Sequence, residues 1–258
     1  MIFLKYSLAT NSIPWSTFIQ MHIHQLIGVK LPLHQGVQLS SLAQRGKYQS
    51  DRLQERQARI LAVARMILGR SGYEGLTMRA LAEEAGVAKK TLYNQFAGKD
   101  DLVLMATNDV LQKITAKVAL VAPGITRILA REQAIFEQIQ ATPAYALAMI
   151  QALHAAKPEQ ALIDVLIRQG AETIHLELQF AQRRAEVRPE IDMRPISWNI
   201  TSQSWGVLTL WAKQCFSLKQ LEQQLTLAQL GILQSIAVKD TKTQLAAKLN
   251  TVLTRSYQ

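Results

Sequence analysis

The chain has 258 residues, of which 48% are hydrophobic and 19% charged, a composition typical of a folded globular protein and not of a disordered one. Its single cysteine, Cys215, excludes an internal disulfide framework and a cysteine-based structural zinc site. No stretch reaches the roughly 18 uninterrupted apolar residues that a membrane helix requires, so we expect no membrane partner. Seven prolines and twelve glycines are few for this length and favour a helical fold.

The positive charge is concentrated in the first part of the chain. Residues 1–100 carry +7 of the formal net charge of +10, residues 101–200 are close to neutral, and the last 58 residues carry +4. A basic first third joined to a neutral middle is typical of a nucleic-acid-binding head on a separate core. Basic proteins without a nucleic-acid partner are also common, so charge alone leaves both interpretations open.

Residues 1–47 show no sustained helical or strand period. The segment contains isolated glycines and the tripeptides Ile13-Pro14-Trp15 and Leu31-Pro32-Leu33. Its charged residues are all basic. We therefore expect a disordered basic extension and assign no function to it.

Helical periodicity begins at Asp51. Apolar residues then recur at i, i+1, i+4, i+7 and i+8, which is one buried stripe of a helix: Ile60, Leu61, Ala64, Ile67 and Leu68. We expect this helix to end in a glycine-flanked loop between Gly69 and Gly75.

Two short helices joined by a glycine-containing turn are expected next. Thr77 is a suitable N-cap for a helix over 78–85, and Gly86 is a suitable glycine to end it. After only Gly86-Val87-Ala88, a third helix is expected over 89–96. Two short helices with a turn of three or four residues form a helix-turn-helix.

The third helix has an apolar and a polar side. Leu92 and Phe96 lie one turn apart and are expected to point into the head. The other positions carry cations, hydroxyls and amides, which suit phosphates and base edges: Lys89, Lys90, Thr91, Tyr93, Asn94 and Gln95. A merely solvated side would more often carry glutamate, so the pattern indicates contact with a nucleic acid.

Lys99 begins a fourth helix beside Asp100 and Asp101. Two acids in the first turn complement the helix dipole, whereas a lysine there is mildly unfavourable unless an anion approaches. A DNA phosphate at this helix N-terminus would supply that anion.

The segment from Gly75 to Leu102 resembles the TetR family of transcriptional regulators. The matching features are a Thr-x-Arg helix start, Ala-Gly-Val in the turn, Thr-Leu-Tyr-x-x-Phe in the third helix and Lys-x-x-Leu after it. One departure is Ala88, where the family usually has a serine or threonine. Losing that N-cap costs about 1 kcal/mol and one phosphate-facing hydroxyl.

The resemblance implies an all-helical homodimer with a DNA-binding domain at residues 48–118 and a ligand-binding and dimerisation domain at residues 119–258. Below, these two segments are called the head and the body. Carried over by position, Thr77 and Tyr93 resemble phosphate contacts and Lys99 a backbone anchor. The candidate readers of base edges are Arg79, Lys89, Lys90, Thr91, Asn94 and Gln95.

The body also has a helical pattern. A break is expected at Pro123-Gly124, and no strand alternation persists anywhere, so we predict an all-α fold. The helices are expected over residues 125–141, 143–155, 158–188, 195–216, 217–239 and 241–255.

The helices expected over 195–216 and 217–239 are apolar on more than one side. Such a pair needs both its own core and a partner. The resemblance places the four-helix interface of a dimer here, and a pair buried within one chain is the alternative.

The resemblance also implies a pocket among the helices of the body. An apolar pocket with a few polar groups suits a small hydrophobic or aromatic molecule. The candidate lining residues, each of which could equally be ordinary core, are Tyr145, Met149, His154, His175, Gln179 and Trp205.

Together with these features, the resemblance implies a dimeric repressor that binds a near-palindromic operator in double-stranded DNA and is released by a small hydrophobic or aromatic molecule as effector. The alternative is a DNA-binding regulator that responds to a protein partner or activates transcription. We expect no enzyme, because the sequence has no glycine-rich phosphate loop, nucleophile elbow or cluster of His, Asp and Glu. We also expect no cofactor, no bound metal and a cytoplasmic location.

Overall fold

A computed structural model describes residues 39–155 and 159–254, with side chains from Arg52 onward. Residues 52–258 form one compact unit. In the described part of this unit every regular element is a helix, and the only pairing of strand type is an isolated bridge between Val187 and Ala237. The predicted all-α fold is confirmed.

The first described helix, α2, spans Leu39–Gly75 and is longer than the sequence pattern predicts. It begins within the segment for which we expected no element, while residues 1–38 lie outside the described residues. It also continues through the expected loop, interrupted only at Gly72, whose φ of 67° and ψ of −176° are not helical. A single glycine is enough to bend the chain here because glycine adopts positive φ without a steric penalty.

The next helices, α3 (Met78–Ala85) and α4 (Lys89–Tyr93), form the helix-turn-helix. Thr77 caps α3, since its Oγ1 accepts a hydrogen bond of 3.1 Å from the Ala80 N–H. Gly86 ends α3 in the left-handed conformation, with φ 62° and ψ 41°. The α3 prediction is therefore confirmed in both its bounds and its caps.

Helix α4 is shorter than the predicted range of 89–96. It has five residues, and its N-cap position, Ala88, offers no side-chain hydrogen bond. The chain still turns beyond Tyr93, because the Phe96 N–H donates to the Leu92 carbonyl at 2.8 Å. The predicted inner side is confirmed, since Leu92 and Phe96 are 0% and 1% exposed.

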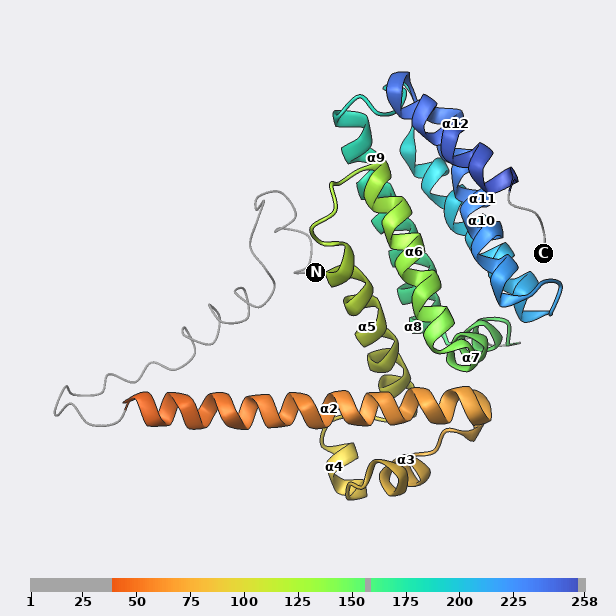
Figure 1. Ribbon diagram of the computed structural model, residues 1–258. Helices are drawn as coiled ribbons and strands as arrows, with labels where there is room; N and C mark the ends of the chain where they lie inside the picture. Colours follow the sequence, from red (N-terminus) through yellow and green to blue (C-terminus); the bar gives the residue numbers. More distant parts are fainter. Residues whose placement is uncertain (1–38, 156–158, 255–258) are drawn as a thin grey trace, which may run out of the picture. The chain divides into compact units, whose positions relative to one another are not determined.

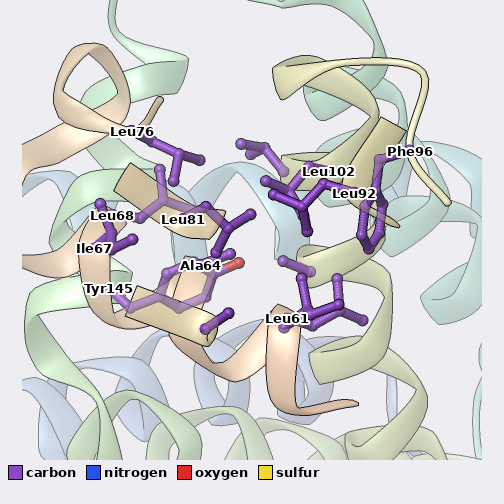
Figure 2. Packing of buried hydrophobic residues seen from close by; sticks show 14 of the residues in the cluster. Leu61, Ala64, Ile67, Leu68, Leu76, Leu81, Leu92, Phe96, Leu102 and Tyr145 are labelled. Atoms are coloured by element: carbon purple, nitrogen blue, oxygen red, sulfur yellow. The ribbon is translucent and has the colours of Figure 1, made fainter. Parts of the chain in front are cut away.

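One hydrophobic core holds the helices of the head together (Figure 2). The predicted stripe of α2 is fully included in it, and so are Leu81 of α3, Leu92 and Phe96. Helix α5 (Lys99–Val118) contributes Leu102, Val103 and Ala106. The same core extends to Tyr145, Ala148 and Met149, which belong to the body.

The body consists of helices whose bounds lie close to those predicted, with one exception (Figure 1). The observed bounds are α6 Ile125–Ala141, α7 Pro143–Leu153, α8 Gln160–Ile163, α9 Gln169–Arg183, α10 Met193–Ala212, α11 Leu218–Ile236 and α12 Lys239–Thr254. The exception is the single helix predicted over 158–188. A π-helical turn over Asp164–Arg168 separates α8 from α9, and such turns occur often at functional sites.

Helix α10 packs between α9 and α11, and α12 covers α11. Helix α6 contacts α5, α7, α9 and α11, so it connects the head to the rest of the body. The apolar pair α10 and α11 shares a core within this chain that includes Leu208, Trp211, Leu221 and Leu225.

We expect Phe96→Ala to lower the free energy of unfolding by about 3–5 kcal/mol, because it empties a fully buried ring site under α4. Urea denaturation followed by circular dichroism measures this change. Asn94→Ala, at an exposed neighbouring position, is the control and should change the value by less than about 0.5 kcal/mol. Equal effects of the two substitutions would contradict the packing described here.

We expect Ala88→Ser to raise the free energy of unfolding by about 1 kcal/mol, since Ala88 already has the extended backbone of an N-cap, with φ −68° and ψ 143°. The serine hydroxyl would accept a hydrogen bond from an unpaired N–H in the first turn of α4. Ala88→Val lacks the acceptor and is the control. A stability no higher than that of the Ala88→Val protein would show that no cap forms.

Candidate functional site

The outer side of α4 is the first candidate site. Lys89, Lys90, Tyr93 and Asn94 are exposed, and Tyr93 retains 58% of its accessible surface. Thr91 and Gln95 are half-buried. The sequence pattern places Gln95 on the outer side of this helix, but its Oε1 atom is buried. This atom has no hydrogen-bond partner among the described residues.

The basic side chains around this surface differ in whether they form ion pairs. Arg79 on α3 is exposed, and its Nε donates to Glu83 at 3.0 Å. Arg70 donates to both carboxylate oxygens of Glu84, at 3.2 and 3.0 Å. Within the described residues, by contrast, neither lysine of α4 forms an ion pair, so their positive charge remains available to an anionic partner.

Thr77 lies at the start of α3, on the edge of the same surface. Its hydroxyl oxygen accepts from Ala80, and its hydrogen remains available to a further acceptor. One side chain can therefore cap the helix and also bind a phosphate oxygen.

Lys99 has partners that sequence analysis missed. Its Nζ lies 4.2 Å from the centre of the Tyr73 ring and 3.8 Å from Glu74 Oε2. The Tyr73 hydroxyl donates a hydrogen bond to Asp100. The pKa of Tyr73 is raised, mainly because the side chain is partly buried and also because of this hydrogen bond. The lysine in the first turn is thus explained by contacts within the protein and does not require a bound anion.

The second candidate site is a cavity of about 190 Å³ that is lined by α5 of the head and by helices of the body. Its walls come from α5, α6, α7, the π-helical turn, α9, α10 and α11. Of the residues selected from the sequence, Tyr145, Met149 and Trp205 lie in its lining. Most of the lining is apolar, with Leu111, Ile128 and Leu208 as examples.

The other three selected residues do not line the cavity. His154 Nδ1 lies 2.8 Å from the Ile150 carbonyl, and its Nε2 lies 3.3 Å from Thr209 Oγ1. His175 is buried, with its Nε2 3.1 Å from Gln179 Nε2. His154, His175 and Gln179 therefore have partners of their own elsewhere in the body.

A buried polar pair in the lining was not predicted. Glu132 of α6 is 9% exposed and Gln229 of α11 is 3% exposed. The Gln229 Nε2 donates to Glu132 Oε2, and burial raises the pKa of Glu132 to about 8. A signal was present in the sequence, because Glu132 lies four residues after Ile128 and four before Phe136, on the buried stripe of α6.

Tyr145 connects the cavity to the head. It is a member of the core of the head and also lines the cavity. Its hydroxyl lies 3.0 Å from Thr107 Oγ1 of α5. Helix α7 approaches α2 closely at Gly69, where a Cβ atom would lie 3.0 Å from the Tyr145 nitrogen. A molecule in the cavity would therefore touch a side chain that the head also packs against.

We expect the stability of the protein to fall as pH rises through the range in which Glu132 ionises. Burial raises its pKa from 4.5 to about 8, so the folded protein retains this proton at pH values where the unfolded chain has lost it. The contribution is complete below pH 4.5, declines by up to about 1.4 kcal/mol per pH unit and is lost above pH 8.

Urea unfolding of the wild type and of Glu132→Gln at several pH values from 5 to 9 tests this expectation. The free energy of the wild type should fall relative to that of the variant up to about pH 8 and run parallel to it above. Parallel curves over the whole range would show that Glu132 ionises as it does in water.

No helix in residues 39–155 or 159–254 combines the length and apolar character needed to cross a bilayer. The same residues contain no group of three or more His, Cys, Asp or Glu side chains placed to hold a metal ion.

Comparisons with known proteins agree with this geometry. The profile of the family described as bacterial regulatory proteins, tetR family, matches residues 60–106. The transcriptional repressor KstR of Mycobacterium tuberculosis is 28% identical over 193 residues, which cover 69% of this chain and 81% of that protein. KstR of Mycolicibacterium smegmatis is 41% identical over 68 residues, which cover 26% of this chain and only 33% of that protein.

A solved structure shares the fold. A protein from Rhodococcus sp., described as a TetR-family transcriptional regulator, superposes with a TM-score of 0.57 at 22% identity, over 70% of this chain and 98% of that one. The relatives are transcriptional regulators and not enzymes. A capped α3, a short α4 with a basic polar outer side and these matches agree: residues 60–106 match the TetR family of bacterial regulatory proteins, and the chain resembles relatives that are transcriptional regulators.

Proposed function

We propose that the protein is a dimeric repressor that binds a near-palindromic operator and releases it when a small apolar molecule occupies the cavity of the body. The observation that carries the DNA-binding part is the two-sided α4. Its inner residues, Leu92 and Phe96, are buried, and its outer side has exposed lysines without an ion pair to any described residue. Because its inner side chains are buried, α4 has one orientation and exposes the same side chains to any DNA that binds.

In this proposal the head comprises residues 48–118 and the body residues 119–258. Thr77 and Tyr93 bind phosphates, and Lys99 contacts the DNA backbone. The readers of base edges are Arg79, Lys89, Lys90, Thr91, Asn94 and Gln95. Arginine or lysine pairs naturally with guanine O6 and N7, and asparagine or glutamine with adenine.

The half-buried Gln95 fits a role at the DNA surface. Its unpartnered Oε1 costs free energy in the unbound protein, so a small rotation of the side chain toward an adenine edge would gain a hydrogen bond. Arg79 would exchange its exposed ion pair with Glu83 for a contact with DNA, and exposed ion pairs contribute little to stability.

The response to a ligand would pass through Tyr145. A molecule in the cavity touches Tyr145, Met149 and Thr107, and each of the first two is also part of the core of the head. The ligand would shift the heads only by binding one arrangement more tightly than the other. In this proposal the ligand moves α7 relative to α2 at Gly69, where the two helices approach each other closely.

Dimerisation would use the pair α10 and α11, as the sequence predicts. Trp198 and Leu210 are large apolar side chains that remain 42% and 49% exposed. Large apolar side chains of this kind are suited to a contact with a second chain. A second copy of the chain would cover them and would place two recognition helices on successive turns of the major groove.

We expect the purified protein to select genomic DNA fragments that share a near-palindromic site at about 0.15 M salt. Lys90→Ala should weaken binding to that site by about 1–3 kcal/mol if it reads a base. Tyr93→Phe removes a phosphate contact and should weaken binding to all sequences alike. Fluorescence anisotropy with labelled duplexes measures both effects.

Lys248→Ala removes the same charge from an exposed position on α12 and is the matched control. If it weakens binding as much as Lys90→Ala does, only the total charge matters and the assignment to α4 is wrong. Selection of fragments without a common sequence would contradict base reading altogether.

A further inference from the structure

The cavity of the body has a polar end that no apolar ligand would satisfy. Three buried oxygen atoms of lining residues have no hydrogen-bond partner among the described residues: Glu132 Oε1, Gln229 Oε1 and Ser204 Oγ. A buried polar atom without a partner costs more than a formed hydrogen bond contributes. Their arrangement in the wall of a cavity suits a ligand that supplies the missing partners.

Glu132 and Gln229 form a donor and acceptor pair. The Gln229 Nε2 already donates to Glu132 Oε2, which leaves one oxygen of each side chain unpartnered beside that contact. Because burial raises the pKa of Glu132 to about 8, the carboxyl group is mostly protonated at neutral pH and offers an O–H. The Gln229 carbonyl can only accept.

The other titratable groups of the lining do not compensate a charge at this position. Glu177 of α9 accepts from the Gly124 N–H at 2.8 Å and from Arg127 at 3.2 Å. Arg131 directs its Nη1 to the exposed Thr115, at 3.3 Å. Tyr145 of α7 is engaged with Thr107, and the lining residues of α5, α10 and α11 are uncharged.

We infer that the effector has an apolar body and an uncharged hydroxyl, which donates to Gln229 and accepts from Glu132. This inference rests on the proposed ligand response and names the class of its ligand. A hydroxyl group is both donor and acceptor, so it satisfies the unpartnered oxygen atoms of Glu132 and Gln229. A carboxylate brings only acceptors, and an ammonium ion brings only donors together with a charge that the apolar walls disfavour.

The volume limits the size of the apolar body. A cavity of 150 Å³ in another protein holds benzene, so about 190 Å³ accommodates one aromatic ring with a short chain. The matched probes are therefore 4-phenylbutan-1-ol, 4-phenylbutylamine, 4-phenylbutanoate and butylbenzene. They share one apolar body and differ in the group that would reach the polar end.

Binding of each probe to the full-length protein at pH 7 is measured by calorimetry or by competition in ligand-detected NMR. We expect the alcohol to bind roughly ten- to a hundred-fold more tightly than butylbenzene and the acid. The inference is overturned if butylbenzene or the acid binds most tightly, if the amine exceeds the alcohol, or if no probe binds.

Variants separate a hydrogen-bonding role from a merely structural one. Glu132→Gln keeps an uncharged group that donates and accepts, so the preference for the alcohol should survive. The double variant Glu132→Met, Gln229→Met makes the polar end apolar, and replacing both partners together is tolerated better than removing one. In it the preference should disappear while butylbenzene still binds. An unchanged preference in the double variant would contradict the inference.

Glu190→Gln removes an exposed carboxylate outside the lining and is the control, which should bind all four probes like the wild type. Operator binding, measured with each probe present, distinguishes the two proposals. If the alcohol is preferred but does not release DNA, the ligand class stands and the ligand response fails. If every probe that binds releases DNA without a preference for the alcohol, the response stands and the ligand class fails.

Discussion

The burial of Leu92 and Phe96 is the contact on which the function of the head depends. Helix α4 has only five residues and lacks a side-chain N-cap, so its own hydrogen bonds cannot hold it in water. Its position comes from these two side chains, which insert into a core that α2, α3 and α5 also build. Because the inner side is held in this way, the outer side has one orientation, and that orientation is what a recognition helix requires.

The same core also joins the head to the body. Tyr145 packs among the apolar side chains of the head (Figure 2), and it also lines the cavity. Close packing transmits a displacement because few voids absorb it. In the proposed function, a ligand in the cavity acts on the head through such contacts, because it must bind one arrangement of the head more tightly than the other.

The buried polar side chains Glu132 and Gln229 in the cavity wall lower the stability of the fold, because one oxygen of each has no hydrogen-bond partner among the described residues. An apolar residue at Glu132 would complete the stripe of α6, and the carboxyl group there has a strongly raised pKa and an unpartnered oxygen. Local departures of this kind are expected where a protein binds something. The π-helical turn, which contributes Val165 and Leu166 to the lining of the same cavity, is a second local departure.

The sequence by itself determined the all-α class, the bounds and caps of α3, and the inward position of Leu92 and Phe96, because these follow from local periodicity and capping chemistry. It did not determine the length of α2 or the break before α9, since helix ends and π-turns depend on packing. It identified only part of the cavity lining, namely Tyr145, Met149 and Trp205. His154, His175 and Gln179 have suitable chemistry but lie outside the lining, whereas Glu132 and Gln229, 97 positions apart, meet only when α6 packs against α11. Only the tertiary structure brings such distant positions together.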